Sequence, residues 1–307
     1  MSWLFLTDDL VFKLKKPVKF PYLDFSSLEA REAACREELN LNRSLAPEVY
    51  LRLARLTREG DGALKIDGQG RTIEWLVVMR RLPSEQMLDA RILADRLTPK
   101  EIEDLAAVLA DFYAQAPPAP ATPDAYLARL RAQLALDRTV LCEPRLPFDH
   151  ARAASILDRI EASLTALESA LRARAENGCL VEGHGDLRPE HICLGEPIRV
   201  IDRLEFNREL RLVDPFDELA YLGLECAMLG ARWIGPVLIE CAARKLAPPP
   251  ERLISFYAAR RASVRARLSL AHLQDAKPRQ REKWAPRAMR YLREAESALS
   301  PHRLEAG

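Results

Sequence analysis

Hydrophobic and polar positions change their spacing near residue 83, and this change divides the chain. Before it, short apolar runs alternate with turn residues. Residues 3–20 hold two such runs around the polar "TDD", which predicts a hairpin of two strands. More antiparallel strands are expected between residues 49 and 83, ending in the apolar strand Trp75 to Met79. The first part of the chain therefore predicts a small antiparallel sheet.

One helix is expected within this first part. The stretch "SSLEAREAACREELNLNRSLAP" places Glu29 three residues after Ser26, which is the pattern of a capped helix start. Apolar residues then recur at helical spacing until Pro47 ends the run. The sheet is thus predicted to carry a single helix.

Long amphipathic helices follow after residue 83. They are predicted in "TPKEIEDLAAVLADFYAQAP" and "HARAASILDRIEASLTALESALRARAEN", which a proline-rich loop separates. Two short strand-like stretches, "VEGHGDLRPEHICL" and "PIRVIDRLEFN", interrupt the helices, which resume at Asp217. We therefore expect two lobes, residues 1–83 and residues 84–307.

Composition argues against a nucleic-acid partner, a membrane span and secretion. The chain has 46 Lys and Arg against 45 Asp and Glu, so no global field favours nucleic acid or an anionic membrane as partner. The most apolar late segment contains Glu225, Arg232 and Glu240, which favours a buried helix pair over a membrane span. Six cysteines without a CxxC pair and a start without signal-peptide features predict a cytoplasmic protein with reduced thiols.

Three ionisable side chains stand out in the two strand-like stretches. Asp186 lies in a tight turn, His191 follows five residues later, and Asp202 ends the next predicted strand. A loop and an adjoining hairpin can bring such groups together, and phosphoryl transfer needs a carboxylate at the acceptor hydroxyl and oxygen ligands for a cation. The alternative is that both aspartates only cap backbone amides in turns.

The wider motifs carry a resemblance. The segments "HGDLRPEH", "VIDRLEFN" and "VDPFDELAYL" resemble the catalytic loop, metal-binding strand end and following helix of the aminoglycoside phosphotransferase and choline kinase family. The segment "VFKLKKPVKF" through "APEVYL" and the segment "EWLVVMRRLP" resemble uncharacterised bacterial members that are often fused to a P-loop ATPase domain. No GxxxxGK[ST] motif occurs in this chain, so such an ATPase would be a separate partner.

This resemblance implies an α+β, protein-kinase-like fold with two lobes, a small antiparallel-sheet N-lobe and a large helical C-lobe. "SWLF" resembles the second strand of a kinase N-lobe. The first strand and its phosphate-covering loop are missing from the expected pattern, so we predict a truncated N-lobe. Either the start codon is assigned too late or the protein covers the phosphates poorly. This departure would weaken catalysis.

The resemblance also assigns roles in the catalytic loop. Asp186 would be the catalytic base, with His184 and Gly185 shaping the loop around it, and Asp202 would hold the metal. Arg188, where the relatives usually have histidine, would contact a phosphate or pair with Glu190. His191 stands where the family normally has asparagine. Because Mg²⁺ prefers oxygen ligands, an imidazole there leaves Mn²⁺ open as an alternative, or His191 would instead bond a phosphate.

ATP is the implied cofactor. Lys13 or Lys15, on one face of the same strand, would reach its phosphates, and Glu38, preferred slightly over Glu37, would orient that lysine. The stretch "VVMRRLP", Val77 to Pro83, would form the hinge that reads the adenine edge, and it includes Met79, Arg80 and Arg81. The plain alternatives are an edge strand with solvated lysines and the simple exit of a buried strand.

Three further features have both a functional and a structural interpretation. Asp217 would brace the catalytic loop or cap its helix, and Glu205 would support the metal, line the acceptor pocket or serve structure only. Four C-terminal arginines would form an anion pocket or pair with carboxylates on a helix face. They are Arg260, Arg261, Arg265 and Arg267.

Together these patterns predict an ATP-dependent phosphotransferase acting on a hydroxyl of a small molecule. The alternative is a catalytically weak or inactive kinase-like protein that binds a nucleotide or a partner. A purely structural helical protein would leave the ordered aspartates as coincidence.

Overall fold

The computed structural model describes residues 1–20, 23–274 and 280–300. Residue contacts divide the chain into two compact units. The N-terminal unit contains Met1–Arg96 together with His184–Arg211, and the helical unit contains Leu97–Gly183 together with Leu212–Gly307. The lobe boundary at residue 83 stays a prediction.

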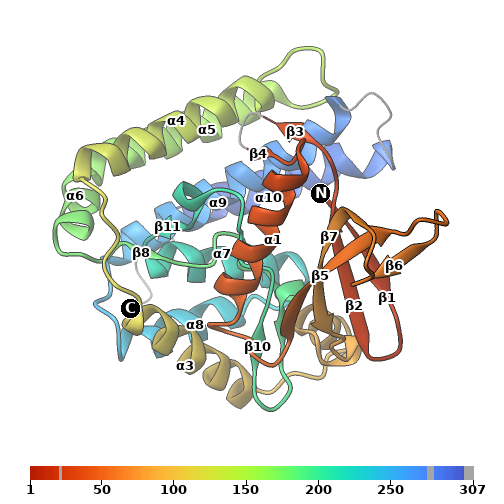
Figure 1. Cartoon of the computed structure of the whole chain (residues 1–307). Helices are drawn as coiled ribbons and strands as arrows, with labels where there is room; N and C mark the ends of the chain where they lie inside the picture. Colours follow the sequence, from red (N-terminus) through yellow and green to blue (C-terminus); the bar gives the residue numbers. More distant parts are fainter. Residues whose placement is uncertain (21–22, 275–279, 301–307) are drawn as a thin grey trace. The chain divides into compact units, whose positions relative to one another are not determined.

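A five-stranded antiparallel sheet forms the core of the N-terminal unit, in the order β1-β2-β7-β5-β6 (Figure 1). The predicted hairpin is present, because β1 (Ser2–Leu6) pairs with β2 (Leu10–Lys15). The predicted apolar strand is the central β7, which buries consecutive residues from Leu76 to Met79. The remaining strands and their bounds are β5 (Tyr50–Arg58), β6 (Leu64–Ile66) and β7 (Arg71–Arg80).

Helix α1 (Leu28–Asn42) packs against β5 and β7, where Cys35 and Val77 share one apolar core. Its cap is Ser27, whose hydroxyl accepts a hydrogen bond from the Ala30 amide at 3.1 Å. The prediction of a cap at Ser26 was wrong by one residue, because the Ser26 hydroxyl instead bonds the carboxylate of Asp24.

The segment His184–Arg211 belongs to the N-terminal unit because its polar groups bond that unit's residues. The Arg203 amide donates to the Asn42 side-chain oxygen at 2.8 Å, and Arg199 pairs with Glu48 at 2.6 Å. The segment contains the predicted hairpin, β9 (Ile192–Cys193) with β10 (Arg199–Val200). The unit's other elements are β3 (Lys19–Phe20), β4 (Leu23–Asp24), α2 (Leu88–Leu93) and the turns η1 (Ser84–Gln86), η2 (Pro189–His191) and η3 (Arg208–Arg211).

The helical unit differs from prediction in two places. Helix α4 was not predicted, and the long helix expected from residue 150 is two helices that meet at Leu167. The α-helices are α3 (Pro99–Gln115), α4 (Pro123–Leu141), α5 (His150–Ala166), α6 (Glu168–Glu176), α7 (Pro215–Met228), α8 (Ile234–Ala243), α9 (Glu251–Ala271) and α10 (Trp284–Ala298). Strands β8 (Val181–Glu182) and β11 (Leu212–Val213) pair, and η4 (His272–Gln274) and η5 (Arg281–Lys283) are short turns.

Buried carboxylates organise the helical unit. The cap of α7 is Asp214, which accepts a hydrogen bond from the Phe216 amide at 2.9 Å, so the alternative that Asp217 caps this helix was wrong. Asp217 instead holds two arginines of α9, Arg260 at 2.6 Å and Arg261 at 2.8 Å.

The other two C-terminal arginines are also paired with carboxylates. Arg265 lies 2.8 Å from Glu225, and Arg267 lies 2.6 Å from Asp137. The structure therefore favours the paired alternative over an anion pocket.

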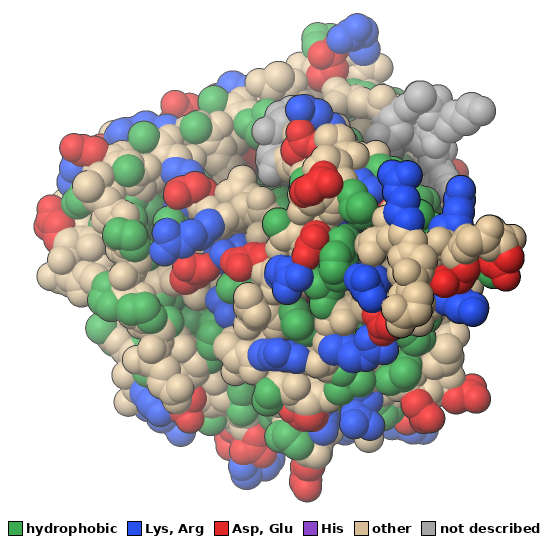
Figure 2. Space-filling model, in the orientation of Figure 1, with side chains coloured by type: hydrophobic (Ala, Val, Ile, Leu, Met, Phe, Trp, Pro, Cys, Tyr) green, Lys and Arg blue, Asp and Glu red, His purple; other side chains and the backbone are tan. Residues whose placement is uncertain are grey.

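The visible surface mixes both signs of charge. Figure 2 shows Lys and Arg side chains interspersed with Asp and Glu side chains, which agrees with the formal net charge of +1. Within the residues described, no helix has the length and hydropathy to cross a bilayer. All six cysteines are free thiols.

Candidate active site

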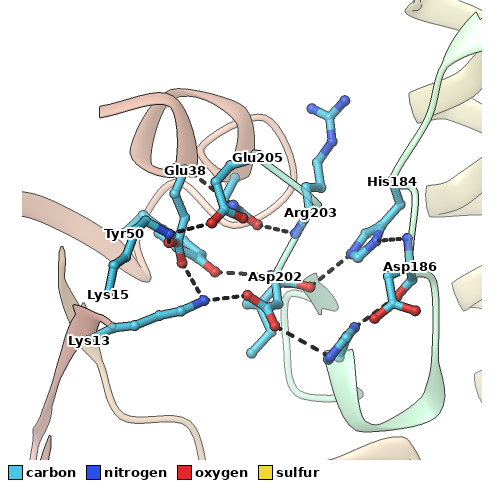
Figure 3. Close-up of polar contacts among 12 residues, drawn as sticks. Lys13, Lys15, Glu38, Tyr50, His184, Asp186, Asp202, Arg203 and Glu205 are labelled. Carbon is cyan, nitrogen blue, oxygen red and sulfur yellow. Dashed lines mark hydrogen bonds and ion pairs between the residues drawn. The ribbon is translucent and has the colours of Figure 1, made fainter. Parts of the chain in front are cut away.

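Two lysines of β2 share one glutamate of α1 (Figure 3). Because side chains alternate along a strand, Lys13 and Lys15 lie on the same face. The Lys13 ammonium donates to Glu38 Oε1 at 2.7 Å, and the Lys15 ammonium donates to Glu38 Oε2, also at 2.7 Å. Glu38 is fully buried, whereas its neighbour Glu37 is partly exposed and lies 3.4 Å from Arg211. The ion pair thus involves Glu38 and both lysines.

Each lysine also bonds a second carboxylate. Lys13 donates to Asp202 Oδ1 at 2.6 Å, and Lys15 donates to Glu205 Oε1. Burial opposes the charge of Lys13, but the nearby Asp202 and Glu38 carboxylates outweigh it and raise the pKa of this lysine. The side chain of Lys13 is 12% exposed and that of Lys15 is 1% exposed. Lys13 is therefore the more accessible of the two lysines.

Asp202 lies two residues after the short hairpin strand β10 and has a left-handed backbone, with φ of 64°. Its amide donates to the Tyr50 hydroxyl oxygen at 3.0 Å, which fixes the turn. Burial would raise the pKa of its carboxyl, yet the Lys13 ammonium holds this pKa below its ordinary range. Asp202 is consequently a carboxylate at neutral pH.

His184 organises the loop that carries Asp186. Its Nε2–H donates to the Ile201 carbonyl at 2.8 Å, and its Nδ1 accepts from the Asp186 amide at 3.2 Å. Burial lowers the pKa of His184 to about 3, so the ring stays neutral and keeps this tautomer. Gly185 has φ of 92°, a conformation that favours glycine. The loop therefore has a fixed shape next to Asp202.

Arg188 lies beside the carboxylate of Asp186, and His191 contacts its backbone carbonyl. Arg188 Nε lies 3.2 Å from Asp186 Oδ2, and Arg188 Nη1 lies 2.8 Å from Glu190 Oε1. The ring of His191 stacks on that of His184, with centroids 5.8 Å apart. His191 Nδ1 is 2.9 Å from the Asp186 carbonyl oxygen, and His191 Nε2 is 3.5 Å from Asp202 Oδ2.

One cavity of about 630 Å³ connects these groups within the N-terminal unit. Its volume lies within the usual range for small-molecule sites. Its polar lining includes Lys13, Asp186, His191 and Asp202. The apolar lining comes from both the sheet and the segment after β10, and includes Leu4, Leu6, Val11, Met79, Leu82, Ile201 and Leu204.

The predicted nucleotide residues fall into two groups. Lys13, Met79 and Arg80 line the cavity. Arg81 is directed to the β1–β2 hairpin, where its guanidinium donates to the Thr7 carbonyl at 2.7 Å, and Lys15 is enclosed by Glu38 and Glu205.

Tyr50 was missed in the sequence. Its hydroxyl supports the backbone of Asp202, a contact that spans 152 positions. No local pattern identifies such a residue. A tyrosine at the start of a strand looks the same in the sequence whether or not its hydroxyl contacts a distant backbone amide.

Few protein side chains beside this cavity can bind a metal ion. In the part of the chain that the structure describes, no three His, Cys, Asp or Glu side chains gather as a metal site. Asp202 Oδ2 and His191 Nε2 are two donors beside the cavity. Two protein ligands fit a cation that completes its coordination with phosphate oxygens and water, as Mg²⁺ usually does. They are too few to form a complete metal site from protein ligands alone.

The architecture defines a kinase-like class. An aminoglycoside phosphotransferase in complex with GDP and kanamycin matches with TM-score 0.55 and 16% identity over 96% of this chain and 90% of that chain. A choline kinase from Cryptosporidium parvum matches with TM-score 0.54 and 11% identity over 99% and 92%. A putative aminoglycoside phosphotransferase from Ralstonia eutropha matches with TM-score 0.52 and 14% identity over 97% and 91%. The predicted kinase-like α+β fold is thereby confirmed.

The chain belongs to the phosphotransferase enzyme family, whose model matches residues 4–202. Uncharacterised proteins of Mycobacterium bovis and Mycobacterium tuberculosis are 33% identical to it over 285 residues. These alignments cover 89% of this chain and 54% of each relative, so the chain spans about half the length of the relatives it matches. The predicted family is confirmed, and the fusion to an ATPase domain stays a prediction.

Proposed function

We propose that this protein transfers the γ-phosphoryl group of ATP to a hydroxyl group of a small molecule. The family membership supports phosphoryl transfer, and the kinase-like fold supports a nucleotide as donor. The observation that carries the proposal is the single cavity shared by Lys13, Asp186 and Asp202. These three residues supply a cation, a base and a metal ligand, the parts that the reaction requires.

Lys13 is the phosphate-binding cation in this proposal. It lines the cavity, its charge is maintained by Glu38 and Asp202, and a small movement of its flexible side chain exchanges Asp202 for a phosphate oxygen. Lys15 stays on Glu38 and holds that carboxylate in place. The adenine would lie against the apolar lining near Met79 and Arg80.

Asp186 is the proposed catalytic base. It accepts the proton of the acceptor hydroxyl as the new oxygen–phosphorus bond forms and the bond to the ADP leaving group breaks. His184 and Arg188 act through Asp186. His184 holds the Asp186 amide, and Arg188 pairs with one oxygen of its carboxylate.

Asp202 and His191 would hold a divalent cation. When bound, such a cation neutralises phosphate charge and aligns the transferring group. Mg²⁺ is the family expectation, and the oxygen of Asp202 fits it. Lys13 would then leave Asp202 for the phosphates.

The test is Asp186→Asn compared with wild type. Transfer to any accepted hydroxyl substrate, or the slow transfer to water, should fall by roughly 10²- to 10⁴-fold, while the calorimetric ATP affinity stays within about twofold. Asp104→Asn is the matched control, because Asp104 is an exposed residue paired with Lys100 in α3. Equal loss of ATP binding in Asp186→Asn would contradict the role as base.

A second candidate is a kinase-like protein that binds nucleotide with little or no transfer. It is favoured by the ion pair between Arg188 and Asp186, which competes with the acceptor for the proposed base. Arg188→Ala separates the two candidates. Increased turnover would indicate an obstructed base, and decreased turnover would indicate that Arg188 positions it.

The acceptor remains a hydroxyl compound of low molecular weight. A cytoplasmic location and a separate ATPase partner stay predictions from the sequence. Pull-down of this chain with the remaining part of a longer relative, with and without ATP, would test the partner.

A further inference from the structure

Strand β1 lies at the edge of the five-stranded sheet and, among the residues that the structure describes, pairs only with β2 (Figure 1). The Thr7 amide donates to the Leu10 carbonyl, and the Lys16 amide donates to the Met1 carbonyl, each at 2.9 Å. Backbone groups alternate in direction along an antiparallel strand, so every second residue of β1 faces outward. The residues whose N–H and C=O groups point away from β2 are Ser2, Leu4 and Leu6.

The side chains of β1 are apolar and exposed. The exposed fractions are 47% for Trp3, 58% for Leu4, 55% for Phe5 and 59% for Leu6. Natural edge strands usually carry a charge, a proline or a bulge that prevents pairing with another strand. No charged residue or proline lies within Ser2–Leu6, and the register with β2 is regular. This edge therefore has the free hydrogen-bonding groups and the apolar side chains of a strand-pairing site.

The two faces of β1 favour a strand over a lipid surface as the occupant. Leu4 and Leu6 line the cavity. Because side chains alternate along a strand, Trp3 and Phe5 lie on the opposite face. A membrane surface would cover only one of these faces, whereas a second strand covers both rows of side chains and the edge between them.

The backbone pattern favours β1 of a second copy as that strand. In an antiparallel pair centred on Leu4, every outward residue of one copy meets an outward residue of the other, because Leu4 faces Leu4 and Ser2 faces Leu6. A register shifted by two residues leaves one outward residue of each copy without a partner. The centred register also places Trp3 opposite Phe5 of the second copy, which forms an aromatic cross-strand pair.

The charges of the β1–β2 hairpin are complementary under the same pairing. Asp8 and Asp9 are exposed at its turn. Lys16 lies at the other end beside Met1, and its ammonium is 5.3 Å from the ring centroid of Trp3. Antiparallel pairing reverses one hairpin relative to the other, so the acidic turn of each copy approaches the lysine end of the other.

We propose that two copies of this chain associate through antiparallel pairing of their β1 strands about a two-fold axis, which joins the two sheets into one. The pairing forms roughly six backbone hydrogen bonds. Ser2 lines the cavity, so Leu6 of the second copy lies beside it on the same face and extends the apolar lining. Because one strand pair is a small interface, the dissociation constant should be on the order of 10 µM. The inference concerns assembly and stands whether or not the cavity binds ATP.

Sedimentation velocity, from well below to well above this dissociation constant, should show a monomer–dimer equilibrium for the wild type. Trp3→Lys and Phe5→Glu should each weaken association about tenfold, because the dimer contains two aromatic cross-strand pairs. Both positions are about half exposed, so the fold should tolerate the changes. Leu64→Lys, at an exposed apolar residue of the opposite edge strand β6, is the matched control and should leave the equilibrium unchanged.

An equimolar mixture of Trp3→Lys and Phe5→Glu should recover dimers. In the mixed dimer, the introduced ammonium of one variant faces the introduced carboxylate of the other, and the second aromatic pair is kept. This recovery is specific to the centred register, because other registers do not place residues 3 and 5 opposite each other.

Amide hydrogen exchange followed by NMR tests the wild type without any substitution. The Leu4 and Leu6 amides should be protected in concentrated protein and should exchange after dilution. The Trp3 and Phe5 amides bond β2 and should stay protected at both concentrations.

The outcomes decide the proposal. Dimers that the two variants lose separately and regain together support it. A wild type that stays monomeric at every concentration overturns it. A dimer in which both variants associate as tightly as wild type, or in which the Leu4 and Leu6 amides exchange freely, also overturns it, because another surface would then hold the copies together. Growth into open chains would indicate pairing of β1 with β6 and would contradict the two-fold arrangement.

Discussion

Both units bury charged side chains, and both bury arginines, but the N-terminal unit also encloses two lysines. The N-terminal unit buries lysines that share carboxylates, as Lys13 and Lys15 share Glu38. The helical unit buries arginines in fixed pairs, as Arg260 and Arg261 each place two hydrogen bonds on Asp217. An ammonium is a compact charge on a flexible stem, whereas a guanidinium has a rigid planar fork.

This difference indicates two uses of buried charge. Lys13 borders a cavity and can exchange one oxygen partner for another at little cost in geometry. Asp217 has both oxygens occupied by forks from α9 and ties α7 to that helix. Exchangeable pairs thus accompany the proposed ligand site, and saturated pairs accompany helix packing.

The largest expected effect breaks the saturated pairs. Asp217→Asn should lower the free energy of unfolding by about 4 kcal/mol, because two buried guanidinium groups lose their carboxylate. ATP affinity should stay within about twofold. Chemical denaturation measures the free energy of unfolding, and calorimetry measures the ATP affinity. An unchanged denaturation midpoint in the variant would contradict the stabilising role of the pairs on Asp217.

The ion pairs of Asp217 with Arg260 and Arg261 also predict that the free energy of unfolding depends on pH. Burial opposes the charge of Asp217, but Arg260 and Arg261 keep its pKa below the ordinary value. Its contribution is therefore fully present above about pH 4 and is lost as the pH falls through the folded-state pKa. The stability difference between wild type and Asp217→Asn should narrow below that pH.

Lys13→Met tests the exchangeable pairs and should have the next largest effect. Loss of the phosphate cation should lower ATP affinity about 10²-fold, because charge-assisted bonds contribute roughly 1.5–3 kcal/mol each. Lys65→Met on the exposed strand β6 is the control. Lys13→Arg should recover little of the lost ATP affinity. Full recovery would mean that the site does not need the flexible ammonium group of lysine.

Lys15→Met should have a smaller effect, about 2 kcal/mol in unfolding free energy, because Glu38 keeps Lys13 but Glu205 loses its partner. ATP affinity should fall about threefold through the displaced Glu38. The double variant Lys15→Met with Glu205→Gln should regain about half of the lost stability. No recovery would mean that Glu205 is not the uncompensated charge.

The smallest effect is expected for Arg261→Lys, about 1 kcal/mol in unfolding free energy. The change keeps a positive charge beside Asp217 and removes one of the two hydrogen bonds that residue 261 donates to it. Arg244→Lys, at an exposed pair with Glu240 in α8, should change stability by less than about 0.5 kcal/mol and serves as control.

Local patterns predicted much of the N-terminal unit. The alternation along β2 placed both lysines on one face, and the helical spacing before Pro47 placed Glu38 on α1. The partners of these groups were harder to predict. Lys15 meets Glu205 across 190 positions, and no short-range signal encodes that contact.

Two errors in the helical unit have different causes. The signal for α4 was present, because Thr122 caps it before Pro123, just as Thr98 and Pro99 begin α3, but the proline-rich loop obscured it. The break at Leu167 has no glycine or proline, and the residue adopts φ of −102° and ψ of 8° within an apolar helical pattern. Packing decides that break, and sequence spacing cannot.

The backbone at Asp202 also limits how this position can evolve. Its φ of 64° suits aspartate, asparagine and glycine, and strains glutamate, alanine or valine, although single-base changes lead to all of these. Mutational drift away from the carboxylate therefore has low-strain routes through asparagine, glycine or histidine. A descendant that took one of them would retain the fold and the Tyr50 contact to the amide while losing the carboxylate, so under the proposed role of Asp202 an inactive lineage would be recognisable from this one position.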